Sequence, residues 1–232
     1  MKVAVLQFPG SNCDQDALWA LRRDIGVGAD YVWHKETSLS GFDAVFVPGG
    51  FSYGDYLRCG AVAAHAPIMR AVVELARAGG LVIGACNGFQ ILCEVGLLPG
   101  ALLKNSQEKF VCKSVTLRSE SSRSPFTLGV DRLLQLPIAH GEGRFVCDEA
   151  TLREIESKGQ VAFRYVDKSG QPTLASNPNG SQNNIAGVMN ESGNVLGLMP
   201  HPERATNTLL GSTDGRLILQ AFSEGSVISR AG

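Results

Sequence analysis

A buried strand, a sharp turn and the start of a helix follow one another in Leu81-Val82-Ile83-Gly84-Ala85-Cys86-Asn87-Gly88-Phe89-Gln90. The G-x-C-x-G pattern at its centre is the cysteine form of the nucleophile elbow, a strained turn that exposes a reactive side chain at the carboxyl edge of a sheet. Gly84 and Gly88 stand at the two offsets where so tight a turn admits only small residues. The stretch therefore predicts a reactive Cys86 on an α/β sheet, the alternative being a small buried cysteine in an ordinary turn.

The segments around this turn alternate between strand and helix patterns. Residues 2–8, 31–33 and 44–47 are short apolar runs rich in β-forming side chains, whereas residues 14–25 and 67–78 carry apolar positions at helical spacing. Asp14 is the predicted N-cap of the first helix, and Pro67 fits the first turn of the second. The alternation predicts a flavodoxin-like, doubly wound and mostly parallel sheet with helices on both faces.

The second half of the chain has a different pattern. Its apolar runs are separated by polar turns with little helical periodicity between them, at residues 110–117, 133–138, 161–166, 185–189 and 195–199. They predict a mixed or antiparallel extension of the same sheet. A last helix is predicted near residues 214–222. Since no repeat or long Gly/Ser/Pro linker divides the sequence, we expect one domain over residues 1–232.

The composition excludes several classes of protein. The 21 Lys and Arg residues against 22 Asp and Glu give a net charge of −1, which argues against nucleic-acid binding, and the 44% of hydrophobic residues argue against disorder. Neither a membrane-spanning apolar run nor a targeting segment is found, so we expect a cytoplasmic protein that does not bind membranes. The six cysteines form no C-x-x-C pair, so we predict reduced thiols and no metal site.

The chemistry expected at Cys86 is nucleophilic. The turn places the thiol at a helix N-terminus, where the helix dipole favours the thiolate. The backbone N–H of Asn87 is then free to donate to an oxyanion, and Gly50, which follows a predicted buried strand, is a candidate second donor. The alternative for Gly50 is an ordinary Pro-Gly-Gly turn.

A cysteine nucleophile needs a base, and the chain has four histidines. His34 and His65 are interpreted as surface or capping residues. The other two begin the triplets His140-Gly141-Glu142 and His201-Pro202-Glu203, in which a carboxylate can orient the imidazole. Prolines on both sides of His201 hold its backbone extended, which favours it over the glycine-flanked histidine, although spacing alone leaves both open.

Together these motifs resemble the class I, or triad, glutamine amidotransferases. Pro48-Gly49-Gly50, Gly84-Ala85-Cys86-Asn87-Gly88-Phe89-Gln90 and Pro200-His201-Pro202-Glu203 follow that family's order of oxyanion loop, nucleophile and His-x-Glu. The resemblance implies that Cys86 is the nucleophile, His201 the general base and acid, and Glu203 the carboxylate that orients it. It also implies oxyanion donors at Gly50 and Asn87, and contacts to bound glutamine from Gln90, Phe51, His140 and Glu142.

A narrower likeness is to the glutaminase subunits of phosphoribosylformylglycinamidine synthase, carried by residues 9–14, 48–60, 86–90, 140–143 and 199–204. It implies hydrolysis of glutamine, with ammonia channelled to a large synthetase subunit that a small accessory subunit accompanies. That synthetase would use ATP and magnesium to convert formylglycinamide ribonucleotide to formylglycinamidine ribonucleotide in purine synthesis. Because no nucleotide-binding motif occurs here, we expect no cofactor in this chain.

The residues leave two other functions open. A stand-alone cysteine hydrolase on the same fold, such as a γ-glutamyl hydrolase, would share the elbow. Peptidase-like relatives carry the base directly after the cysteine, where this chain has Asn87. A non-catalytic, flavodoxin-like binding module would not explain an elbow together with a downstream His-x-Glu. The sequence leaves open whether Arg204 and residues 53–58 serve the interface with the synthetase, the pocket or neither.

Overall fold

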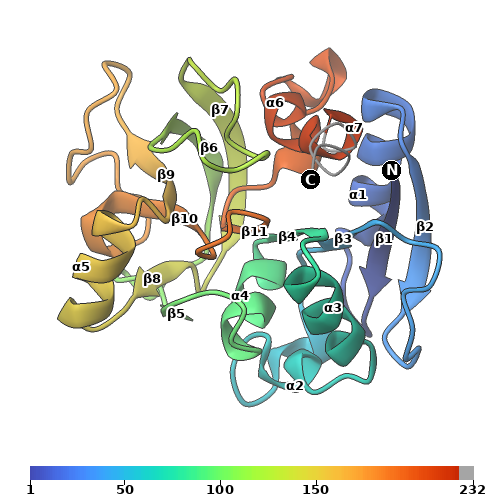
Figure 1. Ribbon diagram of the computed structural model, residues 1–232. Helices are drawn as coiled ribbons and strands as arrows, with labels where there is room; N and C mark the ends of the chain where they lie inside the picture. The colour runs from blue at the N-terminus through green and yellow to red at the C-terminus, as the bar shows by residue number, and fades with distance from the viewer. Residues whose placement is uncertain (225–232) are drawn as a thin grey trace.

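The computed structural model describes residues 1–224, and its centre is a nine-stranded sheet of order β2-β1-β3-β4-β11-β10-β9-β6-β7 (Figure 1). The first five strands are parallel: β2 (Gly28–Trp33), β1 (Lys2–Gln7), β3 (Ala44–Val47), β4 (Leu81–Ala85) and β11 (Val195–Leu198). Since parallel strands end at the same edge, the segments that follow β1, β3, β4 and β11 converge there. This half confirms the predicted doubly wound sheet.

The other four strands continue the same sheet in antiparallel pairing, as predicted. They are β10 (Ile185–Met189), β9 (Val161–Val166), β6 (Val111–Ser119) and β7 (Leu134–His140). The strand β11 is the junction, because it pairs with β4 on one side and with β10 on the other. A separate two-stranded ribbon pairs β5 (Ala101–Leu103) with β8 (Arg144–Val146).

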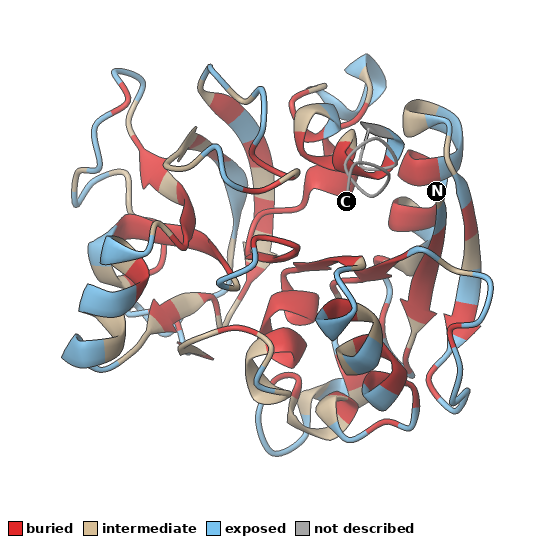
Figure 2. Ribbon diagram, in the orientation of Figure 1, coloured by how far each residue is buried: buried red, intermediate tan, exposed pale blue. Residues whose placement is uncertain are grey.

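Helices cover both faces of the parallel half (Figure 1). On one face lie α2 (Ala61–Ala64), α3 (Ile68–Arg77) and α4 (Asn87–Glu94). On the other lie α1 (Asp14–Trp19), its π-helical continuation η1 (Ala20–Ile25), α6 (Gly215–Leu219) and α7 (Ala221–Glu224). Alternate residues of each strand enter the two cores, and the strands of this half are coloured mainly as buried in Figure 2. Short 3-10 turns complete the described chain: η2 (Ser52–Asp55), η3 (Gln182–Asn184), η4 (Pro202–Arg204) and η5 (Thr208–Leu210).

Several predictions about single elements were wrong. The sequence interpretation missed α5 (Glu149–Ser157), although Asp148 caps it by accepting a hydrogen bond from the Thr151 N–H at 2.8 Å. Asp14 is the first residue of α1 rather than its N-cap, and its carboxylate accepts instead from the side chain of Gln7. His34 is buried, with its Nδ1 hydrogen-bonded to the Tyr53 hydroxyl, so it is not a surface residue.

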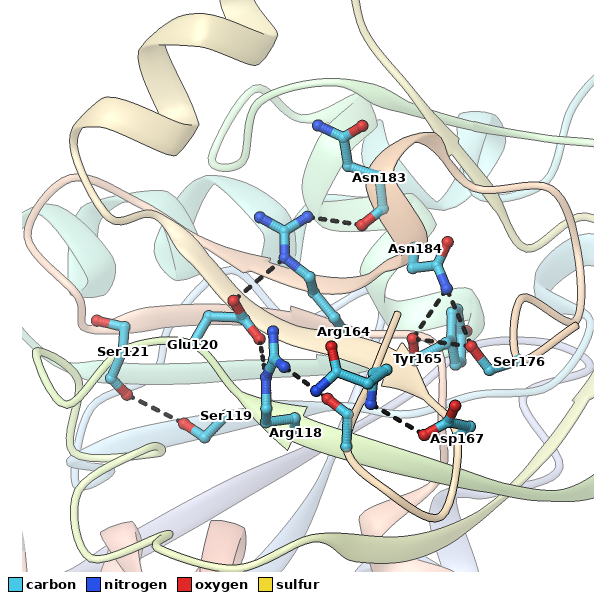
Figure 3. A network of polar contacts seen from close by, with 12 residues as sticks. Arg118, Ser119, Glu120, Ser121, Arg164, Tyr165, Asp167, Ser176, Asn183 and Asn184 are labelled. Atoms are coloured by element: carbon cyan, nitrogen blue, oxygen red, sulfur yellow. Dashed lines mark hydrogen bonds and ion pairs between the residues drawn. The ribbon is translucent and has the colours of Figure 1, made fainter. Parts of the chain in front are cut away.

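A polar network joins β6 and β9 to the segment around Asn183 (Figure 3). Its centre is Arg164 on β9, whose side chain is 11% exposed. The guanidinium pairs with Glu120, which follows β6, at 3.2 Å and with Glu156 on α5, and it donates to the Asn183 carbonyl at 2.6 Å. Arg118 also donates to Glu120, at 2.7 Å.

Within residues 1–224, none of the helices combines the length and the apolar character that crossing a membrane requires.

Candidate active site

Cys86 occupies the turn between β4 and α4 in a strained conformation, with φ 51° and ψ −107°. Such a backbone costs a non-glycine residue about 1–3 kcal/mol. The Cys86 N–H donates to the Leu198 carbonyl of β11 at 2.8 Å, which holds the turn in place. A Cβ atom on Gly84 would lie 2.5 Å from the Gly88 carbonyl oxygen, and one on Gly88 would lie 2.0 Å from that of Val47. The two glycines are therefore required by the turn.

His201 and Glu203 follow β11 and lie at the same sheet edge as Cys86. Both are 1% exposed, and the His201 Nδ1 lies 2.6 Å from Glu203 Oε1. Burial lowers the pKa of the His201 imidazole, but the negative charges of Glu203 and of a Cys86 thiolate outweigh it, so the pKa lies well above its usual value. The Nε2 atom is buried without a hydrogen-bond partner. The imidazole is therefore oriented and charged by Glu203, with a free ring nitrogen in the cavity that Cys86 also lines.

Two backbone N–H groups beside Cys86 are available to an oxyanion. In the part of the chain that the structure describes, neither the Gly50 nor the Asn87 N–H has a backbone acceptor. Gly50 has φ 123°, and a Cβ atom there would lie 2.5 Å from the Asn12 side-chain oxygen. A glycine is therefore needed for this loop to pack against residues 10–12.

The four residues expected to contact glutamine, Gln90, Phe51, His140 and Glu142, all line the cavity of about 200 Å³ that contains Cys86 and His201. Gln90 accepts a hydrogen bond from the Asn87 side chain at 2.7 Å and donates to the Glu142 carbonyl at 2.6 Å. The Asn87 side chain also donates to Asp55 at 3.3 Å. These contacts fix the loops around the nucleophile.

The competing base, His140, has different surroundings from His201. Its Nδ1 contacts the side chain of Asn105 at 3.1 Å rather than a carboxylate. Burial, with the charge of His201, lowers the pKa of His140 to about 4, so the ring is neutral at physiological pH. A base that forms a stable imidazolium needs a carboxylate beside its ring. His201 has one and His140 does not, so this geometry favours His201.

Sequence reasoning missed three residues that line the cavity, Cys13, Cys59 and Phe110, and left the place of Asp55 and Arg204 open. Arg204 donates to Asp16 at 2.8 Å and contacts the Cys13 sulfur at 3.2 Å. One signal for Cys13 was present, because it lies in the turn after β1, whose carboxyl end meets that of β4.

Ligand atoms of Cys13, His201 and Glu203 lie within 4.8 Å of one another, a donor set that zinc accepts. Glu203 already binds the His201 imidazole through a hydrogen bond of 2.6 Å. The expectation of no metal stays a prediction.

Comparisons with known proteins agree with this geometry. Residues 1–219 match the family model of the CobB/CobQ-like glutamine amidotransferase domain. The chain is 53% identical over 224 residues to the phosphoribosylformylglycinamidine synthase subunit PurQ of Moorella thermoacetica, covering 96% of this chain and 95% of that one. It is 54% identical over 234 residues to the PurQ of Thermomicrobium roseum, covering 100% of this chain and 99% of that one.

Among solved structures, a chain of PurLQS from Thermotoga maritima superposes with a TM-score of 0.85 at 45% identity, covering 97% of this chain and 98% of that one. Similarity of this extent runs over the whole fold and includes the segments that carry Cys86 and His201. The chain therefore belongs to the CobB/CobQ-like glutamine amidotransferases and, within them, to the PurQ subunits of phosphoribosylformylglycinamidine synthase.

Proposed function

We propose that this chain is the glutaminase subunit of a phosphoribosylformylglycinamidine synthase and that Cys86, His201 and Glu203 are its catalytic triad. One observation carries the assignment of the residues. The strained turn presents Cys86 to the same cavity as His201, whose other ring nitrogen is held by Glu203 at 2.6 Å. A thiol, an oriented imidazole and free backbone N–H groups are the parts that acyl transfer requires.

The first half-reaction forms a thioester. The Cys86 thiolate attacks the side-chain amide carbon of glutamine, and the oxyanion that forms accepts hydrogen bonds from the Gly50 and Asn87 N–H groups. The His201 imidazolium gives its proton to the amide nitrogen, the carbon–nitrogen bond breaks, and ammonia leaves. A γ-glutamyl thioester on Cys86 and a neutral His201 remain.

The second half-reaction restores the enzyme. Neutral His201 takes a proton from water as that water attacks the thioester carbonyl, and the same N–H groups stabilise the second oxyanion. Collapse breaks the carbon–sulfur bond and releases glutamate, leaving the Cys86 thiolate beside the His201 imidazolium. Glu203 stays ionised throughout and stabilises the imidazolium.

The ammonia serves a partner. The relative from Thermotoga maritima was solved as PurLQS, and we infer that this chain likewise assembles with a large synthetase subunit and a small accessory subunit. ATP and magnesium would act on the synthetase, which converts formylglycinamide ribonucleotide to formylglycinamidine ribonucleotide. We further propose that residues 1–232 act as one glutamine amidotransferase domain, in the cytoplasm, where purine precursors are made.

Glutamate release tests the function. The purified chain is assayed with glutamine alone, and then with its synthetase and accessory subunits, ATP and formylglycinamide ribonucleotide. Release that rises sharply only in the full mixture is expected. Equal, strong release by the chain alone would identify a stand-alone hydrolase, and no release in either mixture would refute the proposal.

Variants test the triad. Cys86→Ala should reduce release by at least about a thousandfold with the fold retained, and His201→Ala should nearly match it. His140→Ala serves as the comparison and should leave more activity. A His140→Ala variant less active than His201→Ala would show that the base was wrongly assigned.

A further inference from the structure

Part of the cavity wall has no role in the acyl-transfer steps and consists of hydrogen-bond acceptors. Asp55, Glu142 and His140 line the cavity together with Cys86. Asp55 lies in η2, and the other two lie at and just after the end of β7. Sequence-distant loops thus bring two carboxylates and an imidazole to one small space, and the chemistry of each shows which kind of group they would bind.

His140, which lines the cavity, has a ring nitrogen with an unused lone pair. The Asn105 amide nitrogen donates to the Lys109 and His140 carbonyls at 2.8 and 2.9 Å, so the Asn105 oxygen faces the His140 ring. That oxygen also accepts from the Gly143 N–H at 3.0 Å. The His140 Nδ1 must therefore carry the proton and donate it, which leaves Nε2 as an acceptor. Nε2 is buried without a partner on a residue that is 3% exposed.

The two carboxylates are not paired with a cation, although Arg204 and His201 line the same cavity. Within residues 1–224, neither Asp55 nor Glu142 takes part in an ion pair. The nearby arginines are engaged elsewhere, Arg58 with Glu94 and Arg204 with Asp16. Among the described residues, therefore, neither carboxylate is neutralised by an ion pair.

The two carboxylates also affect one another. Burial raises the pKa of the Asp55 carboxyl, and the charge of Glu142 raises it further. Both carboxylates add to the rise that burial causes in the pKa of the Cys59 thiol, which places all three groups together. Two negative charges held this close are stabilised by a cation that enters between them.

We propose that Asp55, Glu142 and the Nε2 atom of His140 bind the α-ammonium group of glutamine. An ammonium group has three N–H donors and one positive charge, which matches two carboxylates and a neutral acceptor. This inference rests on the proposed glutaminase function, because glutamine is the substrate that carries an ammonium group three carbons from the reacting amide.

Hydrogen bonds connect this acceptor wall to the nucleophile. The Asn87 side chain donates to Asp55 at 3.3 Å, and Asn87 directly follows Cys86. The Gln90 side chain connects Asn87 to Glu142, since it accepts a hydrogen bond from the Asn87 side chain and donates one to the Glu142 carbonyl. An ammonium group held by Asp55 and Glu142 would thus lie at a fixed separation from the oxyanion donors, which places the amide carbon at the thiolate.

The experiment compares two substrates in the assembled complex with its partner subunits. Glutaramate has the amide and the carboxylate of glutamine but a hydrogen in place of the α-amino group. The wild type should favour glutamine over glutaramate in kcat/KM by about 10- to 100-fold, the range expected for hydrogen bonds to a charged group. Asp55→Asn and Glu142→Gln should each lower kcat/KM for glutamine by most of that 10- to 100-fold preference. Neither variant should change kcat/KM for glutaramate appreciably.

The controls separate binding from damage. Asn tolerates the positive φ of 53° at position 55, so Asp55→Asn should fold, and Glu142→Gln is a second, independent variant. Glu74→Gln, an exposed change on α3, should leave both substrates unaffected. His140→Asn keeps a donor for Asn105 but removes Nε2. It should also lower kcat/KM more for glutamine than for glutaramate.

Two results would overturn the inference, and they differ in meaning. If the acidic variants change kcat/KM for both substrates by the same factor, the carboxylates do not bind the ammonium group, although the glutaminase function stands. If the wild-type complex releases no glutamate from glutamine, the function fails and this inference fails with it.

Discussion

His140 should make the protein less stable as the pH falls. A histidine in an ion pair has a raised pKa and has the opposite effect. Its folded-state pKa is about 4, against 6.5 for an unperturbed histidine. Between these values the unfolded chain binds more protons at this residue than the folded chain, so stability falls as the pH decreases. The full contribution is present above pH 6.5 and is lost progressively as the pH approaches 4.

The magnitude follows from the size of the shift. Each pKa unit corresponds to about 1.4 kcal/mol, so His140 contributes at most about 3 kcal/mol to the free energy of unfolding. About 2 kcal/mol of this contribution should be lost at about pH 4.5. The variant His140→Asn keeps a side-chain donor for Asn105 but does not titrate. Its free energy of unfolding should therefore fall less than that of the wild type over the same interval.

Urea unfolding at about pH 7 and about pH 4.5, followed by circular dichroism, measures the effect. The difference in unfolding free energy between wild type and His140→Asn should shift by about 2 kcal/mol between the two pH values, in favour of the variant at low pH. His65→Asn, which changes an exposed histidine, is the matched control and should show no such shift. Equal shifts in both variants would refute the reasoning about the buried imidazole.

Two further predictions concern the fold. Gly88→Ala should destabilise the protein by about 3 kcal/mol or more, because its Cβ would lie 2.0 Å from the Val47 carbonyl oxygen. Thermal unfolding measures this, with Gly28→Ala, where the nearest atom is 3.8 Å away, as the control expected to unfold near the wild-type temperature. Arg164→Met should cost about 2 kcal/mol, because it leaves the partly buried Glu156 carboxylate without its cation and leaves Glu120 with Arg118 alone. Arg153→Met, on an exposed helical pair, should cost well under 1 kcal/mol, and equal losses for the two arginines would contradict the prediction.

The elements that the sequence predicted well are those whose pattern is local. Residues 44–47, 161–166 and 185–189 were predicted as strands and form β3, β9 and β10 with the same bounds. The elbow was predictable for the same reason, because the space that Gly84 and Gly88 must leave depends only on the turn itself. The missed ribbon strands β5 and β8 have three residues each, too few to show a period.

The missed helix α5 has another cause. Its signals were present, since Asp148 stands three residues before Thr151 and Gly159 follows the end of the helix. The surrounding strands directed the interpretation toward an all-β second half. A capping residue should have outweighed the weak apolar periodicity.

The meeting of Cys86, His201 and Glu203 could be predicted from the sequence, whereas the approach of the other cavity residues could not. Prolines beside His201 gave a local reason to prefer it, and its contact with Glu203 is also local. What distinguishes His140 is Asn105, far away in the sequence, and Asp55 reaches the cavity only because β3 and β4 are neighbours in the sheet. Such approaches depend on topology and loop path, which no single segment encodes.

The position of β11 has a consequence for biosynthesis. Among residues 1–224 it is the last strand to be synthesised, yet it lies between β4 and β10, so the two halves of the sheet are joined only when β11 is inserted. A nascent chain that has already exposed Cys86 lacks its base for another 201 − 86 = 115 residues. At a rate of synthesis of roughly 5–20 residues per second, His201 is made roughly 6–23 s after Cys86. The insertion of β11 also brings His201 to Cys86, so with the triad proposed above a growing chain should not release ammonia before this sheet has formed.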